Sequence, residues 1–392
     1  MPDQPVLIVG GGLGGLTAAL ALAQRGRAVR VFEGAPAFGA IGYGIQFGPN
    51  VFHVFDRLGL MEQVMAAGDE PAAVTMRDGL SDEELVRIPT DAGFRARFNY
   101  PYLIIHRIDL HNVMIDACRA DGHIELIADT RITGYANRGT CAEITTEGGG
   151  THEGELVIGA DGIGSTLRAR MLDDGGPLPN GYVAHRTIIP MEELKADVPT
   201  DVVVLWGGPG FHIVTYPLRH GALFNIVAVF RSANEAPRGD VEAYRAELQQ
   251  TYSGAHRCLR DLIRVMDLER RFIVGDRHPV RKWHDGRVCL LGDAAHPTLQ
   301  TLAQGACMAI EDGLHLAGLI DRGAGHEEIF TAFAADRVVR TARVTLESRA
   351  IWENYHGDGV EREVAFQQFR ERSVEDSYRC LAWLYDGFAF AD

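Results

Sequence analysis

The residues best suited to chemistry lie between positions 288 and 315, where an apolar stretch runs into Gly292-Asp293 and then into a loop and a helical stretch that starts near Gly305. An ionised carboxylate only accepts hydrogen bonds, so Asp293 suits the hydroxyl groups of a sugar-like chain. The helix start directs unpaired N–H groups and a positive dipole end at whatever lies in front of it. Together they could hold a polyhydroxylated anionic ligand. Gly292-Asp293 alone would equally fit a strand-turn-helix with a capping aspartate.

A second group of candidates lies at the N-terminus, where apolar residues 6–9 run into G-G-G-L-G-G. Gly10, Gly12 and Gly15 fill the pattern G-x-G-x-x-G, which allows a tight turn, close approach of the backbone to a pyrophosphate, and packing of the helix on the strand. Glu33 follows the next apolar stretch, 18 residues after Gly15, where an acid can bind the ribose hydroxyls of an adenosine. This order of features predicts a bound adenine dinucleotide.

A third candidate is a histidine in the stretch F-H-I-V-T-Y. The period of two in a strand puts His212, Val214 and Tyr216 on one face. Histidine is the usual general base near neutral pH, so this face could carry a base and a hydroxyl among apolar neighbours. A buried histidine with a structural hydrogen bond is the alternative that the stretch alone leaves open.

The elements that must position these residues change character along the chain. Apolar strands and helices alternate over residues 6–33 and again over 102–120, and antiparallel strands are expected over 124–146. Arg107 falls at a predicted helix start, where it suits a pyrophosphate or an ion pair with Asp109. Residues 39–50 are predicted to form a glycine-rich loop that lies against a flat ring or turns at the surface. Residues 182–230 lack this alternation and predict an antiparallel sheet. Helices are expected over 239–271 and 326–355, followed by an amphipathic tail that packs or dimerises.

Composition narrows the classes of function. At 392 residues and 42.9 kDa the chain favours two domains, and its formal charge of −15 argues against nucleic acid and anionic membranes as partners. The six cysteines form no C-x-x-C pair, which predicts a reduced cytoplasmic protein without a metal site. No signal peptide and no apolar run of membrane-spanning length is apparent, so we expect a soluble protein.

Three motifs in order give the chain a specific resemblance: G-G-G-L-G-G at 10–15, G-A-D-G at 159–162 and G-D-A-A-H-P at 292–297. Together they resemble the single-component FAD-dependent aromatic hydroxylases (group A flavoprotein monooxygenases), typified by para-hydroxybenzoate and salicylate hydroxylases. The resemblance implies an α/β fold (α+β overall) with a Rossmann-like FAD-binding domain and an inserted antiparallel-sheet substrate domain. The implied division is residues 1–73, 100–178 and 276–355 for the FAD-binding domain, 74–99 and 179–275 for the substrate domain, and 356–392 for a C-terminal helical segment.

The resemblance also implies roles for residues. In the family the first motif holds the FAD adenosine and pyrophosphate, the second serves FAD and the incoming NAD(P)H, and the aspartate of the third binds the flavin ribityl chain. The cofactor-binding residues expected here are Gly10, Gly12, Leu13, Gly15, Glu33, Gln46, Arg107, Asp161, Gly292, Asp293, Pro297, Gly305 and Ala306.

Within the family, the chain looks similar to 3-hydroxybenzoate 6-hydroxylases, because His212 and the C-L-A-W-L-Y tail accompany Gln300, where salicylate hydroxylases generally have proline. These enzymes use FAD, NADH and O2 to hydroxylate para to a phenol and make gentisate, through a flavin C4a-hydroperoxide that attacks an electron-rich ring. The resemblance therefore implies His212, Gln300 and Tyr216 as catalytic residues, a small aromatic acid as substrate, and a homodimer. No obvious arginine for the substrate carboxylate stands out, which leaves Tyr216 and backbone amides as candidates.

Other functions remain open at this stage. Salicylate 1-hydroxylase, which releases carbon dioxide, is the alternative inside the family. A flavin dehydrogenase or reductase could use the same FAD frame, and a non-catalytic FAD-binding regulator would show no substrate-stimulated NADH oxidation.

Overall fold

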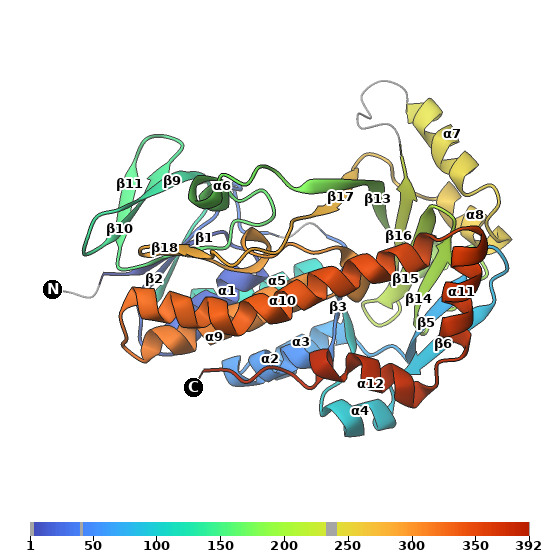
Figure 1. Cartoon of the computed structure of the whole chain (residues 1–392), viewed down its shortest axis with the longest axis horizontal. Helices are drawn as coiled ribbons and strands as arrows, with labels where there is room; N and C mark the ends of the chain where they lie inside the picture. The colour runs from blue at the N-terminus through green and yellow to red at the C-terminus, as the bar shows by residue number, and fades with distance from the viewer. Residues whose placement is uncertain (1–3, 40–41, 233–240, 392) are drawn as a thin grey trace.

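The computed structural model describes residues 4–39, 42–232 and 241–391, and its two main sheets stand side by side (Figure 1). The first has six strands in the order β18-β19-β12-β1-β2-β8, and the second has seven in the order β17-β13-β16-β15-β14-β5-β6. The mixed α/β fold expected from the sequence, with a parallel core sheet and antiparallel sheets, is thereby confirmed.

The six-stranded sheet is parallel except at one edge, where β18 runs antiparallel to β19. Its central strands are short and buried on both faces, as continuous apolar runs predict. The strands are β1 (Val6–Val9), β2 (Val29–Phe32), β8 (Ile124–Ile127), β12 (Val157–Gly159), β18 (His284–Asp285) and β19 (Val288–Leu290).

Two helices pack face to face beside this sheet: α1 (Leu13–Ala23) and α9 (Gly305–Asp321). Small residues let them come close, since a Cβ on Gly313 would lie 2.7 Å from the backbone nitrogen of Ala18. Helix α5 (Arg107–Ala120) also packs on α1. Helix α1 follows the carboxyl end of the parallel strand β1, at the edge of the sheet where α/β folds bind ligands.

The seven-stranded sheet is antiparallel apart from the parallel pair β5 and β14. One face is covered by α7 (Val241–Thr251) and α8 (Arg257–Arg264), which form a separate hydrophobic core with it. The strands are β5 (Ala73–Asp78), β6 (Glu84–Pro89), β13 (Leu178–Pro190), β14 (Val203–Gly208), β15 (Phe211–Leu218), β16 (Leu223–Arg231) and β17 (Phe272–Asp276).

Two elements differ from the sequence-based expectation. Part of the glycine-rich stretch 39–50 is a strand, β3 (Gly44–Phe47), because it pairs with β7 (Leu103–His106). The long strand β13, which starts before the expected sheet, pairs with β16 along nine residues. Both are stabilised by partners distant in sequence, which local patterns do not reveal. The division of the chain into domains stays a prediction.

Smaller elements complete the described part of the chain. They are β4 (Gly68–Asp69), β9 (Ile132–Asn137), β10 (Ala142–Thr146), β11 (Thr151–Gly154), α2 (Phe52–Leu58), α3 (Met61–Ala67), α4 (Ala92–Phe98), α6 (Thr166–Leu172), α11 (Gly359–Arg370) and α12 (Val374–Tyr385), with short 3-10 turns at Pro49–Val51, Met191–Glu193, Gly292–Ala294 and Gln300–Leu302. Among the described helices, none is both long and apolar enough to span a bilayer.

The helix α10 (His326–His356) runs from the first sheet to the second (Figure 1). With 31 residues it is about 46 Å long at 1.5 Å per residue. Near its start, the buried Arg337 donates to Glu311 and Asp312 of α9, both at 2.7 Å. Paired buried charges of this kind are costly to separate, so α10 is fixed to α9 in one position.

Candidate active site

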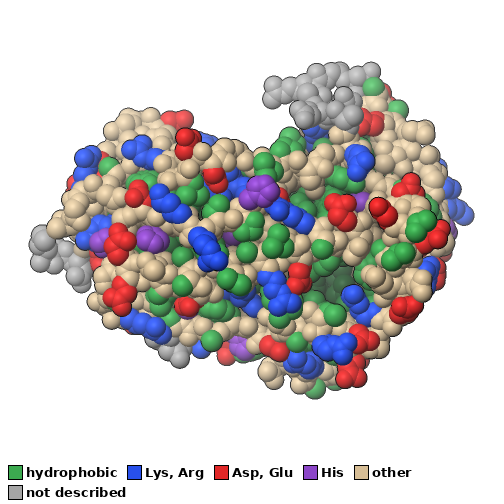
Figure 2. All heavy atoms as spheres, viewed as in Figure 1, with side chains coloured by type: hydrophobic (Ala, Val, Ile, Leu, Met, Phe, Trp, Pro, Cys, Tyr) green, Lys and Arg blue, Asp and Glu red, His purple; other side chains and the backbone are tan. Residues whose placement is uncertain are grey.

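A cavity of about 770 Å³ runs between the two sheets, from the start of α1 to strand β15. Residues of α10, α11 and α12 line its far end, among them Tyr355, Phe369 and Leu381. On the face shown in Figure 2 the surface is hollowed over hydrophobic side chains between the end of α10 and the two C-terminal helices. The cavity therefore connects the glycine fingerprint with the candidate base.

The glycine fingerprint has the spacing that a dinucleotide requires. Gly10 has φ of +113°, and a Cβ there would lie 2.2 Å from the carbonyl oxygen of Ala160. A Cβ on Gly15 would lie 2.1 Å from the oxygen of Gly10, so neither position accepts a side chain. A Cβ on Gly12 would meet nothing within 4 Å, although Gly12 lines the cavity. The space beside Gly12 is thus open to a ligand, as its expected role requires.

Glu33 lies next to this loop. Its carboxylate accepts hydrogen bonds from the backbone N–H groups of Gly11 and Ala35, each at 2.9 Å. These bonds fix the carboxylate at the end of β2, beside the fingerprint. Leu13, the first residue of α1, lines the cavity.

Asp293 faces the cavity. Among the residues that the structure describes, none donates a hydrogen bond to its carboxylate. Burial raises the pKa of Asp293, while His296 and Arg107 favour its charged form. A carboxylate that lines a cavity without a donor fits a ligand that brings its own hydroxyl groups. This arrangement fits the ribityl chain of FAD.

Arg107 is the first residue of α5 and also lines the cavity. The expected alternative, an ion pair with Asp109, is not formed, because Asp109 accepts two hydrogen bonds from Arg219 at 2.8 and 2.9 Å. Gly305 and Ala306 present the uncapped N-terminus of α9 to the same cavity. Guanidinium and helix N-termini both suit phosphates and other anionic groups, so this set fits FAD.

Three further predicted cofactor residues occupy different surroundings. The carboxylate of Asp161 accepts hydrogen bonds from Ser165 Oγ at 2.5 Å and from the N–H groups of Thr166 and Leu167, so it caps α6. Pro297 is buried and does not line the cavity, whereas Gly292 does, with φ of +58°. The roles of Asp161 and Pro297 toward FAD stay predictions without a direct cavity contact.

Gln46 lies between two tyrosines on the cavity wall. Its side-chain oxygen accepts a hydrogen bond from Tyr102 at 2.7 Å, and its amide also bonds the hydroxyl of Tyr216. Burial raises the pKa of Tyr216 to about 12, so its hydroxyl keeps its proton at neutral pH. Tyr216 can therefore donate a hydrogen bond to a ligand oxygen.

His212, Val214 and Tyr216 all lie on the cavity wall, as the period of two predicts. His212 is 1% exposed, and burial together with His356 lowers its pKa well below the usual value. A neutral imidazole next to a cavity is able to accept a proton.

Gln300 joins His212 to a residue that the sequence did not single out. Its Nε2 lies 3.4 Å from Nε2 of His212, and its Oε1 accepts a hydrogen bond from Arg186 at 3.1 Å. Arg186 lines the cavity from strand β13, with its guanidinium 5.7 Å from the ring of Phe272. Recognition of β13 as a strand of this sheet would have pointed to Arg186. His356, the other neighbour of His212, has no local sequence signal.

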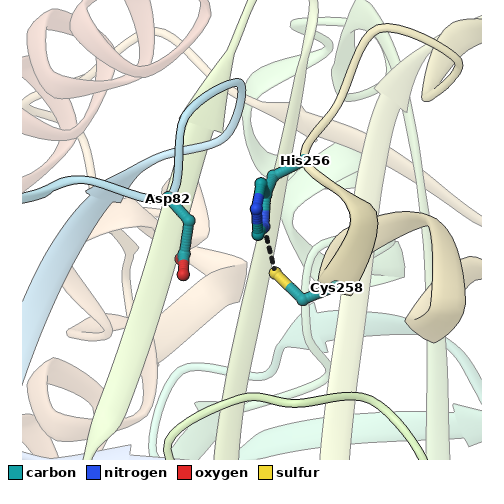
Figure 3. A group of neighbouring side chains, drawn as sticks. All are labelled: Asp82, His256 and Cys258. Carbon is teal, nitrogen blue, oxygen red and sulfur yellow. Dashed lines mark hydrogen bonds between the residues drawn. The ribbon is translucent and has the colours of Figure 1, made fainter.

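Asp82, His256 and Cys258 also come together, although cysteine spacing predicts no metal site (Figure 3). Their possible ligand atoms lie within 4.8 Å of one another, and Nδ1 of His256 is 3.1 Å from Sγ of Cys258. Oδ1 of Asp82 already accepts hydrogen bonds from Arg77 and Trp206, each at 2.8 Å. None of the three residues lines the cavity, and the backbone N–H of His256, just before α8, donates to the carbonyl oxygen of Gly79 in the β5–β6 turn.

Known proteins resemble this chain over almost its whole length. The family model described as "FAD binding domain" matches residues 3–348. The 3-hydroxybenzoate 6-hydroxylase of Polaromonas naphthalenivorans (strain CJ2) is 38% identical, with 98% of this chain and 96% of the relative covered. The 3-hydroxybenzoate 6-hydroxylase 1 of Aquipseudomonas alcaligenes is 35% identical, with 97% of each covered. The crystal structure of Klebsiella pneumoniae HpxO complexed with FAD and uric acid has a TM-score of 0.85 at 25% identity and covers 98% of this chain and 96% of that one.

Proposed function

This chain belongs to the FAD-binding, group A flavoprotein monooxygenases, and we propose that it hydroxylates 3-hydroxybenzoate at carbon 6 to give gentisate, with NADH as the reductant. It is a flavoprotein aromatic monooxygenase. Bound FAD supplies the electrons taken from the nicotinamide and activates dioxygen for transfer of one oxygen atom to the ring. Two relatives that share more than a third of this sequence carry the proposed activity in their names.

His212 is the proposed general base for the phenol. Its cavity-facing nitrogen would take the proton of the hydroxyl group on carbon 3, which raises the electron density of the ring carbons ortho and para to that oxygen. Carbon 6 is the para position. Gln300, within 3.4 Å of His212, would hold the same oxygen through its amide N–H.

The observation that carries the proposal of an aromatic acid is the state of Arg186. Its guanidinium lies deep in the cavity wall, where burial lowers its pKa, and no carboxylate among the described residues pairs with it. A desolvated cation without an anionic partner is costly, and a ligand carboxylate would remove that cost. Carboxylates also match the fork of a guanidinium.

Arg186 and His212 both contact the amide of Gln300, one at its oxygen and one at its nitrogen. A ring held here can therefore place its carboxylate toward Arg186 and its hydroxyl toward His212. In 3-hydroxybenzoate these two groups are meta to each other, and the reactive carbon 6 is para to the hydroxyl and next to the carbon that bears the carboxylate. Tyr216, which keeps its proton, adds a donor at the same wall.

The test uses the FAD-loaded protein, NADH, and 2-, 3- and 4-hydroxybenzoate, with product identification and oxygen-18 labelling of dioxygen. We expect rapid NADH oxidation only with 3-hydroxybenzoate, and gentisate that contains one labelled oxygen. Release of carbon dioxide from 2-hydroxybenzoate, with no gentisate from 3-hydroxybenzoate, would replace the proposed substrate by salicylate. A product without labelled oxygen would point to a dehydrogenase. A rate of NADH oxidation that none of the three phenols increases would point to a regulator.

A further inference from the structure

The inference concerns His356, the last residue of α10, which no sequence motif includes. Its Nδ1 lies 2.8 Å from the carbonyl oxygen of Trp352, and its Nε2 lies 2.8 Å from Nδ1 of His212. A carbonyl oxygen only accepts hydrogen bonds, so Nδ1 of His356 must carry a proton. In a neutral imidazole the other nitrogen then has a free lone pair.

His356 is neutral at physiological pH, because burial and the nearby Arg231 lower its pKa to about 4. Its unprotonated Nε2 can only accept, so Nδ1 of His212 must donate to it. His212 is itself neutral, which leaves Nε2 of His212 without a proton. The tautomer of the base thus follows from the chain Trp352, His356, His212.

The other side of His212 leads independently to the same tautomer. Arg186 has only donors, so the atom of Gln300 that faces it must be the amide oxygen. The amide NH2 group therefore faces Nε2 of His212, at 3.4 Å, and requires an acceptor there. Two networks that share only His212 agree that the lone pair is on Nε2, the atom next to the amide of Gln300 on the cavity wall.

The two imidazole rings have little freedom to rotate. The ring of Trp352 packs against both, with centroids 5.3 Å from His212 and 4.5 Å from His356. The ring of Tyr182 also packs against His356, with centroids 4.6 Å apart. The backbone oxygen of His212 accepts a hydrogen bond from the hydroxyl of Tyr252. The backbone oxygen of His356 accepts from the N–H of Gly210, one residue before β15.

We propose that His356 is a positioning residue, which holds His212 in the tautomer protonated on Nδ1 so that Nε2 can accept the phenolic proton of the substrate. Acceptance of the phenolic proton by Nε2 rests on the proposed function. In the step, the phenol O–H bond breaks and an N–H bond forms at Nε2 of His212, leaving a phenolate. The positive charge that develops on His212 strengthens its hydrogen bond to His356.

The first experiment reads the tautomer directly and needs no substrate. The FAD-loaded protein is labelled with nitrogen-15 histidine, and the His212 signal is identified by its loss in His212→Gln. We expect an Nδ1-protonated imidazole in the wild type and in Gln300→Ala, which removes the amide that also favours this tautomer. In Gln300→Ala with His356→Phe, which keeps a ring but offers no acceptor, we expect an Nε2-protonated imidazole. His212 protonated on Nε2 in the wild type, or on Nδ1 in the double variant, would overturn the proposal.

The second experiment reads proton acceptance with 3-hydroxy-4-nitrobenzoate, a coloured phenol with a meta carboxylate. We expect the pKa of the bound phenol to rise by at least about one unit in His356→Phe, which is a tenfold loss of phenolate stabilisation. Coupling of NADH oxidation to hydroxylation should fall at least about tenfold, because catalytic histidines depend on the group that orients them. An unchanged probe titration in a folded variant would contradict the proposal.

A matched control is His185→Phe. His185 is a buried histidine on β13 that also bonds a carbonyl, that of Arg270, and it does not line the cavity. The variant His185→Phe should lose about as much folding stability as His356→Phe but leave the probe titration as in the wild type. His356→Gln, whose amide oxygen can reach the place of Nε2, should restore part of the coupling, whereas the shorter His356→Asn should not. Equal coupling in these two variants would also count against the proposal.

Failure of the proposed function gives a different pattern. If the wild type neither binds the nitrophenol nor hydroxylates any hydroxybenzoate, the substrate assignment is wrong, while the nitrogen-15 signals still decide the tautomer. If the substrate assignment holds but His356→Phe leaves the probe titration unchanged, and also leaves the nitrogen-15 signals of Gln300→Ala unchanged, the positioning role alone is wrong.

Discussion

The two ends of the cavity are built in different ways. Near Gly12 the wall is mainly backbone, and each of its parts is a local sequence pattern, such as the fingerprint and Glu33, which bonds Gly11 from 22 residues away. Near His212 the wall is a set of side chains, with separations of 88 residues to Gln300 and 144 to His356. A backbone cradle depends on a few glycines and one or two acids. A side-chain network depends on the exact donor or acceptor at each position, so single substitutions should separate binding of FAD from chemistry on the substrate.

The largest effect that would sharpen this comparison is expected for His212→Ala. The hydroxylation step should slow by a hundredfold or more, because removal of a general base typically costs about 10²–10⁴-fold. FAD content should stay as in the wild type, and NADH should still be consumed with loss of the reducing equivalents as hydrogen peroxide. Product yield per NADH, measured by chromatography against a peroxide assay, checks this. Undiminished coupling would place the base elsewhere, and loss of FAD would erase the contrast between the two ends.

The next effect is expected at the other end, for Asp293→Ala. This change removes an acceptor for ligand hydroxyl groups, so the affinity for FAD should fall by about ten- to a hundredfold, as for hydrogen bonds to charged groups of about 1.5–3 kcal/mol. Glu33→Ala should lower the affinity for FAD in the same way. The dissociation constant of FAD, measured by flavin fluorescence on the apoprotein, checks both.

Asp285→Ala provides the control for these changes, because Asp285 bonds Tyr135 beside the same sheet and does not line the cavity. Its affinity for FAD should equal that of the wild type. Full retention of FAD by both Asp293→Ala and Glu33→Ala would rule out their assignment.

A smaller effect is expected for Arg186→Gln, which tests whether the substrate end recognises an acid. KM for 3-hydroxybenzoate should rise about tenfold or more, since a charged hydrogen bond is lost. The same change should leave the KM of a neutral phenol, such as 3-hydroxybenzyl alcohol, nearly unaltered. Steady-state kinetics with both compounds checks this. An equal loss for the acid and the alcohol would assign Arg186 to the shape of the pocket instead of to charge recognition.

The last effect concerns stability and pH, and it leaves activity at neutral pH aside. Above pH 6.5 His356 is neutral both folded and unfolded and contributes no pH dependence. As the pH falls, the unfolded chain takes up a proton that the folded His356, with a pKa of about 4, resists beside Arg231 and the second imidazole of His212. The free energy of unfolding should therefore fall between pH 6.5 and 4, by roughly 3 kcal/mol from this group alone. Urea unfolding at pH 7 and 4.5 should show a shallower fall for His356→Phe, and an equal fall would contradict the assignment.

The sequence could predict most of the first region. The fingerprint, Glu33, the helix start at Arg107 and the Gly292-Asp293 turn are local patterns, and the structure brings all of them to the same part of the fold. The period of two also predicted the face of β15 that carries His212 and Tyr216.

The second region could be predicted only in part. Arg186 lies on a strand whose sheet partners come from residues 223–231 and 272–276, so its position depends on pairing rather than on a motif. His356 reaches His212 because α10 is long enough to cross from one sheet to the other, a distance set by tertiary packing. Asp161 shows the opposite case: the residue belongs to a recognisable motif, but its carboxylate caps the following helix α6.

The length of α10 has a consequence for recombination among related enzymes. The family model ends at residue 348, eight residues before His356, so the region matched by this model and the acceptor for His212 fall on opposite sides of that limit. A chimera joined near Ser348 would keep FAD binding and the base from one parent and take the acceptor of the base from the other. Exchange of C-terminal segments is therefore expected to alter proton transfer in such chimeras, while His212, Gln300 and Arg186 stay unchanged.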